Sequence, residues 1–191
     1  MTRKLEFFYD YVSVYSYLAN SQLAGIGAEI VYRPMFLGAV LKATGNTPPA
    51  TVEAKGAYLF KDVARWVQRY EIPYKMNPEF PQNTVNALRL ALVAQEKGAF
   101  DSVHQLLFDS MWALKKDLSD TILLAEVATS AGLPADEMLS EIGSDRIKDR
   151  LRENTDEAIR RGAFGAPTIF VGDEMFFGND RFEFVTQALT A

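Results

Sequence analysis

Apolar and polar positions divide the chain into two strand-like ends and a helical middle. Residues 5–9 form a short apolar run that predicts a strand. Ser13 stands where a helix should begin, and residues 28–33 predict a second strand. We therefore expect a strand–helix–strand unit at this end of the chain.

A β-hairpin is predicted near the other end. The apolar runs 169–171 and 174–177 are separated by Gly172-Asp173, a pair typical of a type II′ turn. Pro167 precedes the first run, where a strand start or an edge tolerates a residue without an N–H. A cis Pro167 would leave the N–H and C=O of Ala166 free to pair with an extended ligand. The alternative is a plain turn proline.

Between these ends the apolar residues recur at helical spacing. The predicted helices cover residues 59–70, 84–98, 100–114 and 119–132, and residues 135–161 are expected to form one or two more. Phe60, Leu114 and Ile122 belong to the apolar positions that define their faces. We predict an α/β protein in which residues 39–150 form an all-helical domain. This domain is inserted into a second domain, made of residues 1–38 and 151–191.

Composition narrows the class of protein. The 191 residues carry a net charge of −5, with 48% apolar and 24% charged residues, which is ordinary globular usage. We expect no nucleic acid as a partner and no membrane span, because a basic patch and an apolar run of ~20 residues are both missing. The first residues do not resemble a signal peptide, so we expect a cytoplasmic protein. The single histidine, His104, is expected to be a surface or half-buried structural residue, with no metal site.

The absence of cysteine decides how the start of the first helix is interpreted. A thioredoxin-like disulfide oxidoreductase carries Cys-x-x-Cys there, whereas this chain has Ser13-Val14-Tyr15-Ser16 and no cysteine at all. Protein thiol redox chemistry is therefore excluded, and any thiol must come from a ligand. Ser13 could act only as a helix N-cap. It could also donate a hydrogen bond to a ligand thiolate held at the positive end of the helix.

Three motifs together resemble the 2-hydroxychromene-2-carboxylate isomerases, which are bacterial relatives of the kappa-class glutathione transferases. The first surrounds Ser13, the second is Gly-Asn-x-Pro-Pro at residues 45–49, and the third runs from Phe164 to Arg181. The resemblance covers essentially the whole chain and implies a thioredoxin-like fold, glutathione as cofactor and a homodimer. One departure is Val14, where the family usually has proline.

The resemblance also implies which residues bind glutathione. Asn46 and Lys55 match family positions that contact it, and Asn179-Asp180 match the site of its γ-glutamyl group. From the residues alone, Asn179 could instead cap the last helix, and a lone lysine is usually a solvated surface charge. Ser13, Tyr15, Ala166 and Pro167 complete the predicted site, with Ser13 as the catalytic residue. For Tyr15, core packing is the simpler alternative.

Three functions remain compatible with these residues. The first is a glutathione-dependent isomerase of a small aromatic catabolic intermediate, working by reversible thiolate addition. The second is a glutathione transferase, in which the added thiolate stays on the product. The third is a glutathione- or peptide-binding protein without catalysis. Consumption of glutathione separates the first two, and the pKa of the bound thiol separates the third.

Overall fold

A four-stranded mixed sheet forms the centre of the α/β unit. The structure is a computed structural model that describes residues 4–191. The strands are β1 (Lys4–Tyr9), β2 (Glu29–Pro34), β3 (Thr168–Val171) and β4 (Glu174–Phe177), in the order β2-β1-β3-β4. β1 runs parallel to β2 and antiparallel to β3, and β3 and β4 are antiparallel. The predicted strands at both ends of the chain are confirmed.

The C-terminal hairpin has the turn that its sequence predicts. Val171 pairs with Glu174, so Gly172 and Asp173 alone make the turn. Gly172 has a φ of +60° and Asp173 has a negative φ, as a type II′ turn requires. The Ala166–Pro167 peptide bond before the hairpin is cis. Of the two alternatives for Pro167, the structure has the cis proline and not the plain turn proline.

Helices make up the remaining regular structure of the described chain. They are α1 (Val14–Leu23), α2 (Leu37–Thr44), the 3₁₀ helix η1 (Pro49–Thr51), α3 (Glu53–Tyr70), α4 (Val85–Glu96), α5 (Phe100–Trp112), α6 (Thr121–Ser130), α7 (Ala135–Glu141), α8 (Asp145–Arg160) and α9 (Phe182–Thr190). Polar side chains fix three of their starts, because Ser13, Asp120 and Ser144 each accept a hydrogen bond from a first-turn N–H.

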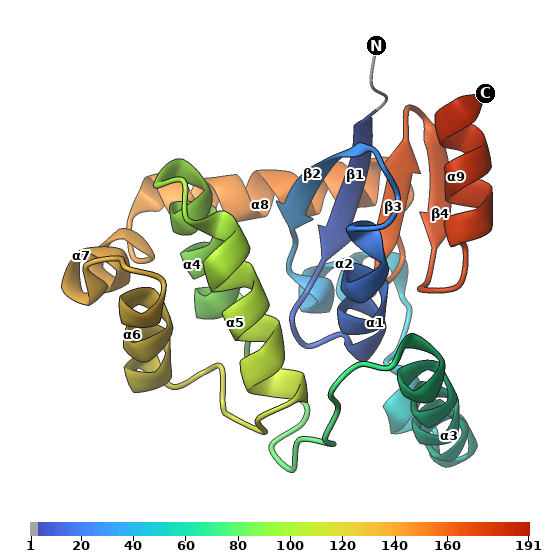
Figure 1. The fold of residues 1–191 in the computed structure, drawn as a ribbon, viewed down its shortest axis with the longest axis horizontal. Helices are drawn as coiled ribbons and strands as arrows, with labels where there is room; N and C mark the ends of the chain where they lie inside the picture. Colours follow the sequence, from blue (N-terminus) through green and yellow to red (C-terminus); the bar gives the residue numbers. More distant parts are fainter. Residues whose placement is uncertain (1–3) are drawn as a thin grey trace.

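The helices lie on both sides of the sheet and extend well beyond it. α8 packs on β2 and α2, whereas α9 packs on β3 and β4. α1 contacts α3 and α5, and α4–α7 gather beyond the β2 edge (Figure 1). Helices α3–α8 thus form a helical segment inserted between the strands of a thioredoxin-like fold. α8 runs unbroken across the predicted boundary at 150/151, and the division into two domains stays a prediction.

β1 carries buried apolar residues on both faces. Leu5, Phe7 and Tyr9 belong to the main core, while Phe8 packs with Phe170 in a smaller cluster on the opposite face. Three apolar positions of the helical pattern lie at the surface instead: Phe60, Leu114 and Ile122. Periodicity identified the helices of Phe60 and Ile122 correctly, whereas Leu114 lies just beyond the end of α5 at Trp112. Periodicity cannot tell which part of an apolar face packs against a neighbour.

Candidate functional site

Ser13 lies at the N-terminus of α1 and touches the segment that contains the cis proline. Its Oγ accepts a hydrogen bond from the Ser16 N–H at 3.1 Å and donates one to the Ala166 carbonyl at 2.9 Å. Ser13 is thus an N-cap, and it also bridges two segments 153 residues apart. Within the described part of the chain, the N–H groups of Val14 and Tyr15 have no acceptor. The start of α1 therefore presents free donors beside a hydroxyl.

The backbone of Ala166 is only half available to a ligand. Its N–H has no acceptor among residues 4–191. Its carbonyl, however, already accepts the Ser13 hydroxyl, which differs from the expectation that both groups are free. Pro167 is held separately, since its carbonyl accepts from the Gly178 N–H at 3.1 Å.

A buried carboxyl fixes the loop that leads into Ser13. Asp10 Oδ1 accepts from the Val12 N–H at 3.1 Å and from the Thr84 hydroxyl, and Oδ2 accepts from the Leu37 N–H at 2.9 Å. The Asp10 carbonyl also accepts from the Ser13 N–H at 3.0 Å. Burial raises the pKa of Asp10, and the three hydrogen bonds oppose that rise. The sequence alone assigns Asp10 no role, and the structure shows that it joins the starts of α1, α2 and α4.

His104 is structural, but it is buried rather than at the surface or half-buried. Its Nε2 lies 3.0 Å from the Asn20 amide oxygen, and its Nδ1 lies 2.9 Å from the Tyr11 hydroxyl. Because an amide oxygen only accepts, Nε2 carries the proton and Nδ1 accepts from Tyr11. Burial lowers the His104 pKa to about 3, so the ring stays neutral. Trp112 Nε1 donates to the Tyr11 carbonyl at 2.8 Å and so helps to hold the loop that leads into Ser13.

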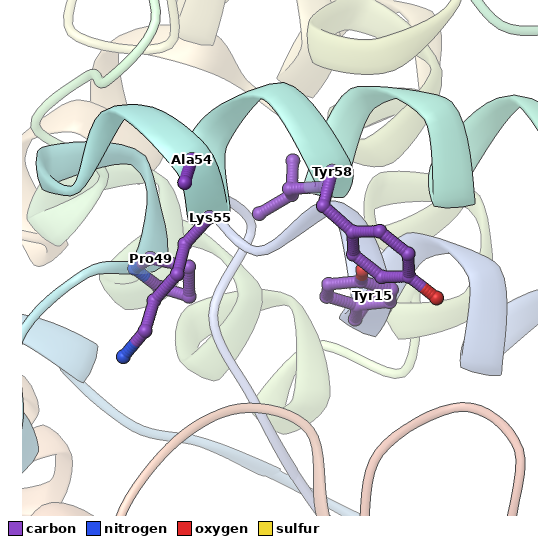
Figure 2. Close-up of a pocket in the computed structure, with 6 residues that line it drawn as sticks. Tyr15, Pro49, Ala54, Lys55 and Tyr58 are labelled. Carbon is purple, nitrogen blue, oxygen red and sulfur yellow. The ribbon is translucent and has the colours of Figure 1, made fainter.

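A pocket of about 380 Å³ opens between α1, η1 and α3. Its lining consists of Tyr15, Pro49, Ala54, Lys55, Tyr58 and Leu59. Figure 2 shows the rings of Tyr15 and Tyr58 together at one end, and the Lys55 side chain extending beside Pro49 at the other. Tyr58 is 60% exposed. The pocket therefore offers an aromatic wall and one ammonium group.

The Tyr15 hydroxyl is hydrogen-bonded to a carboxylate on α3. It donates to Asp62 Oδ2 at 3.0 Å. Burial raises the pKa of Tyr15, and the bond to Asp62 raises it further, so the side chain stays a neutral phenol. Tyr15 thus presents its ring to the pocket, while its hydroxyl keeps its proton and donates it in the hydrogen bond to Asp62. Tyr15 and Lys55, which are predicted from the sequence as ligand-binding residues, both line this pocket. The sequence does not single out Tyr58 or Asp62, because their helical spacing shows only that they share a helix.

Asn46 reaches the segment just before Ala166. Its Nδ2 donates to the Phe164 carbonyl at 2.9 Å, and its Oδ1 accepts from the Thr47 N–H at 2.9 Å. Asn46 is exposed, in the turn between α2 and η1. The second motif and the cis-proline segment are therefore joined directly.

Asn179 does not cap the last helix. The N-cap of α9 is Arg181, whose side chain makes no capping bond. Asn179 is 2% exposed and is tied to α3, because its carbonyl accepts from the Tyr70 hydroxyl at 3.0 Å. Asp180 is exposed and pairs with Arg181 at 2.6 Å. Burial raises the pKa of Tyr15 and of Tyr70, and the charge of Asp180 adds to both rises, so Asp180 lies within electrostatic reach of both hydroxyls.

Residues 4–191 contain neither a cluster of metal-binding side chains nor a membrane-spanning helix. No group of three or more His, Asp or Glu side chains could hold a metal ion there. In the same residues, no helix is both long and apolar enough to cross a membrane.

Comparison with known proteins gives the family. The model of the DSBA-like thioredoxin domain matches residues 4–190. This chain belongs to that family. The DSBA-like chain is 31% identical to 2-hydroxychromene-2-carboxylate isomerase of Sphingobium xenophagum, with 99% of each protein covered. It is also 31% identical to glutathione S-transferase kappa 1 of Rattus norvegicus, over 98% of this chain and 91% of that protein.

A solved structure supports the same placement. A 2-hydroxychromene-2-carboxylate isomerase superposes with a TM-score of 0.90 at 28% identity, covering 98% of this chain and 94% of the other. The resemblance seen in the sequence motifs is thereby confirmed. The relatives of this DSBA-like chain are enzymes named for two activities, isomerisation and glutathione transfer. Identity near 30% does not decide between them.

Proposed function

We propose that this protein is a glutathione-dependent isomerase of the 2-hydroxychromene-2-carboxylate type. One observation carries the proposal: the Ser13 hydroxyl lies at the α1 N-terminus, 2.9 Å from the carbonyl that precedes the cis proline. The helix start and the hydroxyl together favour an anion. Since the chain has no cysteine, a thiolate bound there must belong to a ligand.

The donors and charges around Ser13 fit glutathione. The unpaired Ala166 N–H suits the carbonyl of an extended cysteinyl residue. The Lys55 ammonium suits the glycyl carboxylate, and Asp180 suits the ammonium of the γ-glutamyl end. Asn46 would approach the same peptide beside Phe164. We therefore assign Ser13, Tyr15, Asn46, Lys55, Ala166, Pro167, Asn179 and Asp180 to the glutathione site.

Ser13 and the first turn of α1 would supply the electrostatic part of catalysis. When bound, glutathione supplies a nucleophilic thiolate for reversible addition to a conjugated double bond of the substrate. A free thiol has a pKa near ~8.5, and lowering it by about 2 corresponds to about 2.7 kcal/mol. One charge-assisted hydrogen bond contributes about 1.5–3 kcal/mol and a helix N-terminus about 0.3–1 kcal/mol. The combined range of the two contributions brackets the value that this shift requires.

The pocket between α1, η1 and α3 fits an aromatic substrate. The rings of Tyr15 and Tyr58 provide apolar contact for an aryl group, and a neutral Tyr15 adds no charge to that wall. An aromatic substrate and a small thiol cofactor are compatible with the cytoplasm, which is the location we propose.

The decisive assay offers the protein 2-hydroxychromene-2-carboxylate with and without glutathione. We expect isomerisation, followed by ultraviolet absorbance, only with glutathione, which should be recovered unchanged. Ser13→Ala should lower turnover at neutral pH about tenfold, because each unit of thiol pKa changes the thiolate fraction tenfold. Turnover should recover as the pH rises. Full activity of Ser13→Ala at every pH would reduce Ser13 to a helix cap.

A second candidate is glutathione transfer. It is favoured by the 31% identity to the rat kappa 1 transferase and by Val14, which departs from the isomerase pattern beside Ser13. Loss of free glutathione in the presence of an aryl chloride would identify this activity. A bound thiol that titrates as in free solution would instead indicate a binding protein without catalysis.

We further propose that the protein is a two-fold homodimer, the commonest soluble oligomer. The dimeric family that its motifs resemble supports this assembly. Light scattering at micromolar concentration should give twice the mass of one chain. A mass near the 21.4 kDa of one chain would contradict the proposal.

A further inference from the structure

Ser13 has one hydroxyl proton, and in this structure that proton is already used. The hydroxyl donates to the Ala166 carbonyl at 2.9 Å, while its oxygen accepts from the Ser16 N–H. Among residues 4–191, Ser13 is the only donor to this carbonyl. A serine hydroxyl cannot donate to two acceptors fully. Before Ser13 can donate to a ligand sulfur, it must leave Ala166.

Leaving Ala166 without a substitute is unfavourable. Ala166 is 9% exposed, and a buried carbonyl that loses its donor carries the penalty of an unmade hydrogen bond. A new donor at that oxygen would remove the penalty. Once the carbonyl is paired, the Ser13 proton prefers the charged sulfur, because charge-assisted hydrogen bonds are about twice as strong as neutral ones.

The free Ala166 N–H determines where the new donor comes from. In an antiparallel pair, two opposed residues exchange both of their N–H···O bonds. A ligand residue whose carbonyl accepts from the Ala166 N–H therefore places its own N–H at the Ala166 carbonyl. The two groups of Ala166 thus require one ligand residue that carries both an amide N–H and a C=O.

We propose that Ser13 and the ligand exchange donors at Ala166. The N–H of the ligand's cysteinyl residue takes over the Ala166 carbonyl, and the released Ser13 hydroxyl turns to the sulfur. The thiol proton leaves to water, and Ser13 stays a neutral hydroxyl. This inference rests on the proposed function and refines it: the site activates cysteinyl peptides, and a thiol without the flanking amide binds without full activation.

The test compares three ligands at saturating concentration. They are glutathione, an analogue with an ester oxygen in place of the cysteinyl N–H, and a control analogue with the ester at the glycyl N–H. The titration midpoint of the bound thiol is read from the ultraviolet absorbance of the thiolate. We expect the cysteinyl ester to titrate about one pH unit higher than glutathione, a tenfold smaller thiolate fraction. The glycyl ester should titrate with glutathione.

Two serine variants assign that difference to Ser13. Ser13→Ala removes the exchanging hydroxyl, so glutathione and the cysteinyl ester should titrate together. Ser16→Ala is the matched control on the same helix. Its Oγ is buried and has no hydrogen-bond partner in the described chain, and its backbone N–H still caps onto Ser13. The difference should therefore persist in Ser16→Ala. Ser13→Gly, which an N-cap tolerates, replaces Ser13→Ala if that variant does not fold.

The outcomes separate this inference from the proposed function. Donor exchange is wrong if the cysteinyl ester titrates with glutathione in the native protein, or if their difference survives in Ser13→Ala. In either case a lowered midpoint for bound glutathione leaves the proposed function standing. If glutathione does not bind, or titrates as in free solution, the proposed function and the exchange both fail.

Discussion

Two regions around the proposed site differ in character. One, which we term the buried frame, consists of Asp10, Tyr11, His104 and Trp112. The other, which we term the ligand face, consists of Asn46, Lys55, Tyr58 and Asp180, all of them exposed. Polar groups of the frame bond to residues far away in the sequence, such as Asp10 to Thr84 and Tyr11 to His104. On the ligand face, the one ion pair that Asp180 makes among residues 4–191 is with its neighbour Arg181.

This difference separates stability from affinity. Hydrogen bonds in a buried network are expensive to break, because each lost partner leaves a buried group unpaired. Exposed charges contribute little to folding, so they remain available to a ligand. The frame would therefore hold Ser13 in place before glutathione arrives. Substitutions on the ligand face would change the affinity for glutathione without destabilising the fold.

The largest expected effect comes from breaking the frame at Asp10. Asp10→Ala leaves the Val12 and Leu37 N–H groups and the Thr84 hydroxyl without their acceptor. We expect a loss of about 3 kcal/mol in the free energy of unfolding, about 1 kcal/mol for each bond. Urea denaturation measures it. Asp180→Ala is the matched control and should change stability by less than about 0.5 kcal/mol. Equal losses in the two variants would abolish the distinction between frame and ligand face.

The next effect is a pH dependence carried by His104. Its pKa is about 3 in the folded protein and 6.5 as an ordinary histidine. The unfolded chain therefore binds the extra proton between these values, and stability falls as the pH drops below 6.5. At about pH 4.5 the expected loss is about 2.7 kcal/mol, from about 1.36 kcal/mol for each pH unit. Urea denaturation at pH 6.5 and at about pH 4.5 measures this loss of stability. In His104→Gln, the part of the pH dependence that comes from His104 should be absent. An unchanged slope would mean that His104 is protonated within the fold.

Local patterns predicted the parts of the molecule that local chemistry determines. The first strand, the Ser13 cap and the Gly172 turn each depend on residues within a few positions of one another. The buried frame could not be read in this way, because Tyr11 meets His104 across 93 residues. The same reason hid the contact between Tyr70 and Asn179, 109 residues apart. Helical periodicity placed His104 on a helix, but only packing shows that it is buried.

The resemblance to a family supplied candidates for the ligand face that the residues alone did not. Lys55 and Asn46 would have stayed surface residues by spacing alone. The structure places Lys55 in the pocket with Tyr15 and joins Asn46 to Phe164. Exposed side chains leave little pattern in a sequence, because burial does not constrain them. Tyr58 is 60% exposed and was missed for that reason, whereas Asp62 is half-buried and meets Tyr15 across 47 residues.

A smaller effect is expected from the ligand face at Asp180. A fully buried charge would be worth roughly 2 kcal/mol of glutathione affinity, but this carboxylate is 39% exposed and already paired with Arg181. We therefore expect Asp180→Ala to weaken binding by about 1 kcal/mol, roughly fivefold in Kd. Calorimetry measures the change, and thermal unfolding should stay the same. An unaltered Kd would remove Asp180 from the proposed γ-glutamyl site.

The smallest effect is expected at Lys55, and it is the sharpest test of whether the ligand face is a site at all. Lys55 is exposed, so Lys55→Gln should weaken glutathione binding by only about 0.5 kcal/mol, and rising salt should abolish the difference. Lys61→Gln removes the same charge from the same helix, at a position outside the pocket lining. It should leave the Kd unchanged at every salt concentration. If both variants weaken binding equally, the affinity for glutathione depends on the net charge of α3. In that case the pocket that Lys55 lines does not hold the glycyl carboxylate.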